Sequence, residues 1–232
     1  MIILYKQTNE YVFDRIYDGI KYLVISHQVP PGARLNIEKL AIRFDVSTTP
    51  VREVLNRLVA RDLIEIIPKM GFFTKHLSET ELRDILDLNR LLLNYAVICL
   101  KQAAKPEAGV TAPGLRRRPD FPSDTSELSA EMLTEMTANL FDHMAEASGN
   151  MKLVRHIQTI NDQLRFTRLR EYASASSMSA ELARLHDDYR NGAYAALQNG
   201  LATFHANRAA FLPRLIRDLI LHPPPHSSPR AK

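Results

Sequence analysis

The sequence has little of what secreted proteins and many enzymes depend on. It contains one cysteine, Cys99, inside the apolar run Val97–Leu100, so no disulfide framework can form and a reducing cytoplasm is the expected compartment. A lone thiol in such a run is expected to fill the core. No apolar run reaches bilayer length, and Met1–Leu4 is too short for a signal peptide, so we expect no membrane association.

Enzyme chemistry is also poorly supported by the sequence. Only eight glycines are present, and none belongs to a phosphate-binding loop. No Ser-His-Asp arrangement, metal-ligand cluster or activated cysteine is evident. We therefore expect a protein that is not an enzyme, the alternative being an all-helical enzyme that uses its scattered histidines.

The positive charge is concentrated in the first third of the chain. Residues 1–77 hold 11 Lys and Arg against 8 Asp and Glu, whereas the remainder holds 19 against 18. A local basic excess is what phosphate neutralisation requires, although its size alone does not establish DNA binding.

Residues 36–63 predict two short helices separated by a tight break, with a sharply marked start to the second. Ser47, Thr48 and Thr49 are candidate N-caps, and Pro50 suits a first helical turn because its missing N–H has no partner there. The apolar positions that follow share one helical face: Val51, Val54, Leu55 and Leu58. This pattern is typical of a helix-turn-helix that addresses a DNA groove, or of an ordinary helical hairpin in a bundle.

The next residues favour the first interpretation. Leu63–Ile67 and Phe72–Lys75 are strand-like runs, and Pro68–Gly71 is a turn with a basic residue. Together they predict a β-hairpin wing. A winged helix that serves only protein contacts remains an alternative, against which Arg52 and the basic wing tip argue.

These residues resemble the GntR family of bacterial transcription regulators, in its FadR or FCD branch with an all-helical effector domain. The resemblance is specific over about the first third of the chain and continues more weakly to about Leu212. It is carried by Pro31-Gly32, Arg34-Leu35, Leu40-Ala41, Val46-Ser47, Thr49–Glu53, Leu55, Arg57-Leu58, Leu63 and Gly71.

The rest of the chain predicts helices only, giving a mostly α fold with two domains and a tail. We expect a winged helix-turn-helix over 1–76, an all-helical effector-binding and dimerisation domain over 77–222, and a disordered tail over 223–232. Helices are predicted at 9–27, 79–104, 127–147, 153–172, 179–198 and 202–221. The segment 104–125, rich in proline and containing three consecutive arginines, predicts a long solvated loop, with contact to DNA or an acidic partner as the alternative.

The resemblance implies a small metabolite in the helical domain, which many family members hold against a divalent metal. Counting along the chain from Asn150 and Gly200 assigns the four metal-ligand positions to Thr137, Phe141, Arg190 and Leu212. None is a metal ligand of the expected kind, so we predict no metal and no cofactor. A relocated metal site using His186 and His205 is the alternative.

The four positions at which family members have metal ligands still predict an effector pocket in this chain. It would be lined by Thr137, Phe141, His186, Arg190 and Leu212 and would favour a carboxylate or another anion, since Arg190 is its fixed positive charge. The alternative for Arg190 is an ion pair with Asp187 or Glu181.

The expected partners are a palindromic double-stranded DNA operator, a small-molecule effector and a second copy of the chain, as in a dimeric repressor. The residues predicted to contact DNA are Arg34, Ser47, Thr48, Thr49, Arg52, Arg57, Lys69 and Gly71. Many family members have an arginine directly after the serine that starts the second helix, where it reads a guanine. Thr48 takes that position here.

Overall fold

The computed structural model describes residues 2–76, 78–103, 122, 128–174 and 177–221. The predicted proline-rich loop and the predicted tail lie almost entirely outside these residues. Contacts divide the chain into two compact units, one within Met1–Leu77 and one over Ser78–Leu221. Among the described residues, no helix is both long and apolar enough to cross a bilayer.

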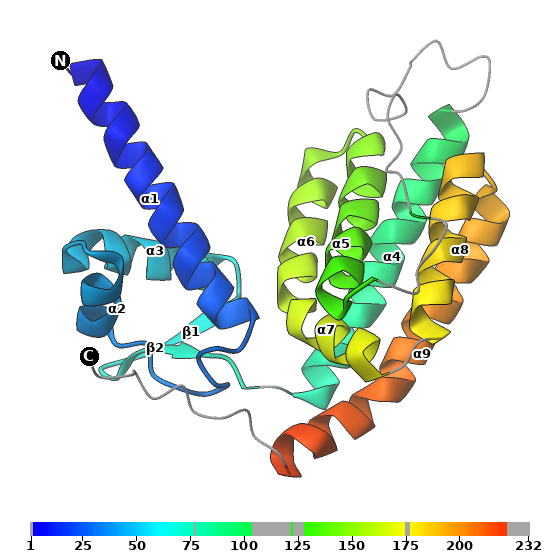
Figure 1. Ribbon diagram of the computed structural model, residues 1–232. Coiled ribbons are helices and arrows are strands. Elements are labelled where there is room, and N and C mark those ends of the chain that lie inside the picture. The colour runs from blue at the N-terminus through cyan, green and yellow to red at the C-terminus, as the bar shows by residue number, and fades with distance from the viewer. Residues whose placement is uncertain (1, 77, 104–121, 123–127, 175–176, 222–232) are drawn as a thin grey trace. The chain divides into compact units, whose positions relative to one another are not determined.

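The first unit is a winged helix (Figure 1). It contains α1 (Ile2–Ile25), α2 (Ile37–Phe44) and α3 (Thr48–Ala60), followed by β1 (Ile64–Ile67) and β2 (Gly71–Thr74). The strands pair antiparallel, with Ile64 opposite Thr74 and Ile67 opposite Gly71. The predicted wing is therefore confirmed, within a residue or two at each end.

Left-handed backbone ends two of these helices. His27, with φ of 55°, follows α1, where its N–H donates to the Val24 carbonyl at 3.0 Å. Asp45, also with φ of 55°, ends α2 and turns the chain into α3. The apolar faces of α1 and α3 then pack together, because Ile16, Ile20 and the predicted apolar positions of α3 are all buried.

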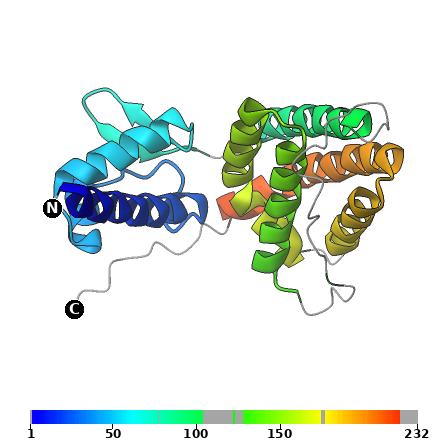
Figure 2. The same ribbon diagram turned by 90° about the horizontal axis from the view of Figure 1, so that it is seen from above.

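The second unit is a bundle of helices, and its described part contains no strand. The helices are α4 (Glu79–Ala103), α5 (Ala130–Ala147), α6 (Met151–Gln163), α7 (Arg165–Ser174), α8 (Ser177–Asn191) and α9 (Tyr194–Leu221). Figures 1 and 2 show α4 and α9 side by side, and α5 contacts α4, α6, α7 and α8. The helix α5 is therefore the most central element of the bundle.

The helix predicted from residue 9 begins at Ile2, and two boundaries between helices of the second unit also differ from the prediction. The helix expected over 153–172 is divided at Leu164 into α6 and α7. The break expected near Gly200 lies at Gly192 instead, where φ is 68° and the N–H donates to the Tyr189 carbonyl at 3.2 Å. Gly200 lies inside α9, where a Cβ atom would come within 2.8 Å of Leu185 on α8. That glycine allows a close helix–helix approach and does not end a helix.

Candidate functional site

The start of α3 presents three hydroxyl side chains at the surface. Ser47 is the N-cap residue, with φ of −72° and ψ of 167°, and its side chain makes no capping hydrogen bond. Ser47, Thr48 and Thr49 are all exposed. A helix start of this kind carries backbone N–H groups without intrahelical partners and the positive end of the helix dipole, both of which suit phosphate oxygens.

A groove of about 510 Å³ lies between α3, the start of α2 and the wing. Its lining includes Arg34, Arg52, Asn56 and Lys69, against a single acidic side chain, Glu38. Lys69, with φ of 66°, lies in the turn between the strands. The groove therefore combines three cations with an amide, which is chemistry suited to phosphates and base edges.

Four of the eight residues predicted to contact DNA line this groove, while Ser47, Thr48 and Thr49 lie at the exposed start of α3, outside its lining. Arg34, Arg52, Lys69 and Gly71 line the groove. Arg57 instead packs on α1, with its Cζ atom 4.9 Å from the ring centroid of Tyr17. Asn56 was not predicted, although its spacing of four residues from Arg52 indicates the same face of the helix.

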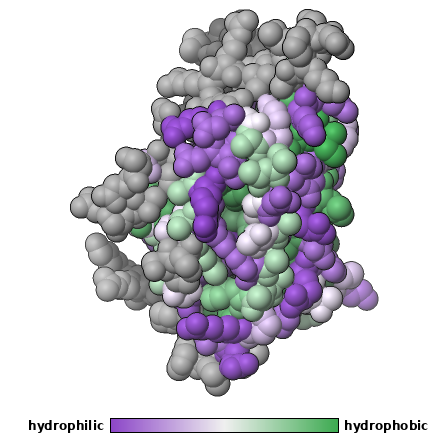
Figure 3. All heavy atoms as spheres, turned by 90° about the vertical axis from the view of Figure 1, so that its right-hand side faces the viewer, coloured by the Kyte–Doolittle hydropathy of each residue, from purple (hydrophilic) through white to green (hydrophobic). Residues whose placement is uncertain are grey.

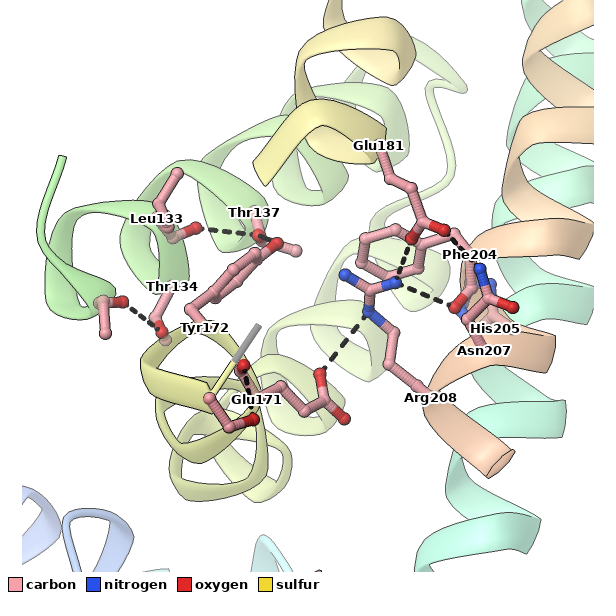
Figure 4. Close-up of polar contacts among 12 residues, drawn as sticks. Leu133, Thr134, Thr137, Glu171, Tyr172, Glu181, Phe204, His205, Asn207 and Arg208 are labelled. Carbon is pink, nitrogen blue, oxygen red and sulfur yellow. Dashed lines mark hydrogen bonds and ion pairs between the residues drawn. The ribbon is translucent and has the colours of Figure 1, made fainter. Parts of the chain in front are cut away.

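A second candidate site is a cluster of charged side chains inside the helical unit (Figure 4). Arg208 on α9 is 1% exposed and forms ion pairs with Glu181 on α8, at 2.6 Å, and with Glu171 on α7, at 3.5 Å. Its guanidinium also lies over the ring of Phe204, with Cζ 3.2 Å from the centroid. Three helices thus meet at one buried guanidinium.

Arg168 on α7 supplies a second buried guanidinium. It is 3% exposed, donates from Nη1 to Asn161 Oδ1 at 2.8 Å and lies over Phe141 with Cζ 5.2 Å from the centroid. Burial lowers the pKa of Arg168 to about 10, so it remains a cation at neutral pH. Nearby, the hydroxyls of Thr137 and Tyr172 are hydrogen-bonded at 2.7 Å.

Several polar atoms of this cluster have no hydrogen-bond partner. They are Arg168 Nη2, Arg208 Nη2, Glu171 Oε1, His205 Nε2 and Thr167 Oγ1, all fully buried. Burial raises the pKa of Glu171 to about 7, against the opposing effect of the two arginines, and lowers the pKa of His205 to about 3. Leaving such groups unpaired is costly, and either water molecules or a polar ligand would satisfy them.

The predicted effector residues are divided by the structure. Thr137 and Phe141 contact the buried cluster, and His186 and Leu212 are buried. Arg190 is not part of the cluster: its side chain is 50% exposed and pairs with Asp187 at 3.1 Å. The count that assigned it started from Gly200, whereas the turn lies at Gly192. Gly192 precedes Gly200 by eight residues. Counting from Gly192 therefore replaces Arg190 by Leu182 and Leu212 by Phe204, and both of these residues are buried.

The described residues contain no group of three His, Cys, Asp or Glu side chains close enough to hold a metal ion. His205 Nδ1 lies 2.7 Å from the Leu201 carbonyl oxygen, which leaves only Nε2 facing the cluster. The buried cluster is thus built from guanidinium, carboxyl and hydroxyl groups.

Comparison with known proteins identifies the class of protein to which this architecture belongs. Residues 13–74 match the family described as bacterial regulatory proteins, gntR family. The chain is 28% identical over 153 residues to the Nta operon transcriptional regulator of Aminobacter aminovorans, covering 66% of this chain and 71% of that protein. It is 33% identical over 87 residues to the HTH-type transcriptional repressor GlaR of Escherichia coli K12, covering 34% of this chain and 40% of the repressor.

A solved structure of a putative transcriptional regulator GntR from Rhodococcus sp. RHA1 has the same fold. It superposes with a TM-score of 0.64 at 14% identity and covers 87% of this chain and 97% of that one. Fold and matches together define a winged helix-turn-helix DNA-binding protein. Residues 13–74 thus match the GntR-family helix-turn-helix domain, and the chain is similar to GntR-family transcription regulators in having an N-terminal helix-turn-helix domain and a helical C-terminal domain.

Proposed function

We propose that the chain is a cytoplasmic repressor of the FadR/FCD branch that binds a palindromic operator as a homodimer and responds to a small anionic metabolite. Residues 1–76 would bind DNA, and residues 77–222 would bind the effector and join the two copies. The observation that carries this proposal is the basic groove between α3 and the wing. Repression, as opposed to activation, is favoured because one relative, GlaR, is described as a transcriptional repressor.

In this proposal, the start of α3 enters the major groove and the wing follows the adjacent backbone. Ser47 and Thr49 would contact phosphates, while Arg52 and Asn56 lie one and two turns further along the exposed face. Arg34, Lys69 and Gly71 would contact the backbone from the other side of the groove. We assign Arg57 a supporting role instead, because it stacks on Tyr17.

The effector site is supported by the two buried arginines. Arg168 and Arg208 each keep one Nη2 atom without a partner, and Phe141 and Phe204 provide apolar walls beside them. A carboxylate or similar anion would satisfy those donors with charge-assisted hydrogen bonds. Thr137 and Tyr172 would add hydroxyl contacts, and Arg190 would not take part.

Regulation would follow from the position of this cluster between α7, α8 and α9. Glu171 and Glu181 pair with Arg208 in the described structure, so an entering anion competes with them for one guanidinium. Displacing either carboxylate loosens the contact between its helix and α9. A ligand that prefers one arrangement of these helices shifts the population toward it, and this is how it would alter DNA affinity.

The experiment is an operator selection followed by an effector screen. Purified protein is used to select sites from random double-stranded DNA, and the proposal requires enrichment of a palindrome. Small carboxylates are then screened for release of that DNA. Arg168→Met should lose the release while binding DNA unchanged, with circular dichroism to establish that it is folded, and the exposed Arg190→Met is the matched control that keeps the release. Arg208 is left intact in this test, because its removal would leave Glu171 and Glu181 without their partner. Failure to enrich any sequence would contradict the proposed DNA recognition.

A further inference from the structure

An apolar stripe runs along the exposed side of α4. Leu88, Leu91, Tyr95 and Ile98 are 46%, 58%, 49% and 45% exposed, whereas the opposite side of the helix is buried against the bundle. Isolated exposed apolar residues are ordinary, but four on one face of one helix are not. Figure 3 shows strongly hydrophobic residues at the surface along the upper right-hand margin of that view, beside a face on which hydrophilic and hydrophobic residues are mixed.

The stripe residues are separated by three, four and three positions along the helix. This is the a/d spacing of a coiled coil, in which apolar residues form a narrow seam against a partner helix. The spacing is the same in both directions along the helix. A twofold axis that passes between Leu91 and Tyr95 therefore places the stripe of one copy against the stripe of an antiparallel second copy. That axis pairs Leu88 of one copy with Ile98 of the other, and Leu91 with Tyr95.

The charges beside the stripe favour the same arrangement. The first half of α4 is net acidic, because its four carboxylates outnumber Arg83 and Arg90, which pair with Glu79 and Asp87 on the same helix. Lys101 is exposed near the other end. An antiparallel pair brings the acidic end of each helix to the basic end of the other, and it also opposes the two helix dipoles. A parallel pair would join like charges at both ends. The acidic flank likewise disfavours an anionic membrane surface as the partner.

We infer that the stripe Leu88–Leu91–Tyr95–Ile98 is the homodimer interface, in which α4 of one copy packs antiparallel against α4 of a second copy. The inference rests on the proposed function in requiring a dimer, and it adds the surface and the direction of pairing. A palindromic operator is bound by a protein dimer with twofold symmetry, because each half-site contacts the same surface of one subunit.

Cysteine cross-linking tests the direction of pairing. In a Cys99→Ser background, Leu88→Cys and Ile98→Cys are purified as separate proteins, then mixed to exchange subunits and oxidised. The antiparallel pairing predicts a disulfide-linked dimer only in the mixture. Each variant alone would hold its two new thiols about 15 Å apart along the helix axes, beyond disulfide reach. Dimer bands from each variant alone would indicate parallel pairing and overturn the inference.

Disruption of the stripe tests its contribution. Leu91→Glu with Tyr95→Glu brings four carboxylates together at the twofold axis, so the mass in solution should fall from twice the chain mass to the 26.4 kDa of one chain. Met151→Glu, at a 65% exposed position on α6, is the matched control and should remain dimeric. Circular dichroism establishes that each variant is folded, and full-site DNA affinity should fall at least tenfold only in the stripe variant.

The outcomes separate the two proposals. A dimeric wild-type protein whose stripe variant stays dimeric, with no cross-link in the mixture, overturns the α4 interface and leaves the dimeric regulator intact. A wild-type protein that is monomeric at all concentrations overturns both.

Discussion

Arg208 and Glu171 form an ion pair at 3.5 Å, between the guanidinium Nε and the carboxyl Oε2, in which each side chain is only 1% exposed. Burial disfavours the charged carboxylate more than the two neighbouring arginines favour it, so the pKa of Glu171 rises to about 7. Glu171 therefore changes its charge near neutral pH. The cluster has one negative charge fewer when that carboxyl group is protonated.

The first prediction concerns the stability of the fold between about pH 4.5 and 7. Over this range the folded protein keeps a proton on Glu171 that the unfolded chain has released, because the pKa is higher in the folded state. Stability contributed by Glu171 is thus present at low pH and lost as the pH rises toward 7. Glu171→Gln should remove this loss, which is on the order of 3 kcal/mol from the size of the pKa change.

Chemical denaturation of both proteins across this pH range measures the effect as a difference between variant and wild type. The difference is needed because burial lowers the pKa of His186 to about 4 and that of His205 to about 3, which gives a contribution of opposite sign. Those histidines are present in both proteins and cancel. Parallel stability curves for wild type and Glu171→Gln would contradict the raised pKa.

The second prediction contrasts two arginines that lie at different depths. Arg208→Ala removes the partner of two carboxylates and should destabilise the fold by about 3–5 kcal/mol. Arg190→Ala breaks an exposed pair with Asp187, which should cost at most about 1 kcal/mol. Urea midpoints measure both. Equal losses would show that burial does not set the importance of these two residues.

The winged helix could be predicted from the sequence because its signals are local. The hydroxyl residues before Pro50, the apolar face of α3 and the strand–turn–strand pattern each lie within a few residues of one another. The first helix was predicted to end at residue 27, and the structure has a left-handed residue there, His27 with φ of 55°. Short-range backbone chemistry decides all of these features.

The interior of the helical unit depends on distant contacts and was predicted less well. Gly200 looks like a helix end in the sequence, but its role is to let α9 approach Leu185 on α8. Counting from it displaced the inward positions and selected the exposed Arg190. Arg168 and Arg208 were not among the predicted site residues. Neither carries a local signal, because their partners come from other helices.

The third prediction concerns the contribution of Arg52 to DNA binding. Arg52→Ala should weaken operator binding by about 1–3 kcal/mol, because the side chain lines the groove and is exposed toward it. Fluorescence anisotropy with the selected operator at several salt concentrations measures the loss. If the contact is to a phosphate, the salt slope should fall by about one unit and all sequences should weaken alike. Arg83→Ala, an exposed arginine outside the winged helix, is the control expected to leave affinity unchanged.

The last prediction concerns the base that the start of α3 recognises. The GntR resemblance implies an arginine directly after the N-cap serine that reads a guanine, and this chain has the exposed Thr48 there. A threonine hydroxyl offers one adaptable hydrogen bond, whereas an arginine makes two to the O6 and N7 atoms of guanine. Sites selected from random DNA should therefore show a relaxed preference at one position of each half-site. Thr48→Arg should restore guanine at that position and no other, with a preference of about 1–3 kcal/mol over other bases. Recovery of a strict guanine by the wild-type protein would assign that base to another residue, and Asn56 or Arg52 would be tested next in the same selection.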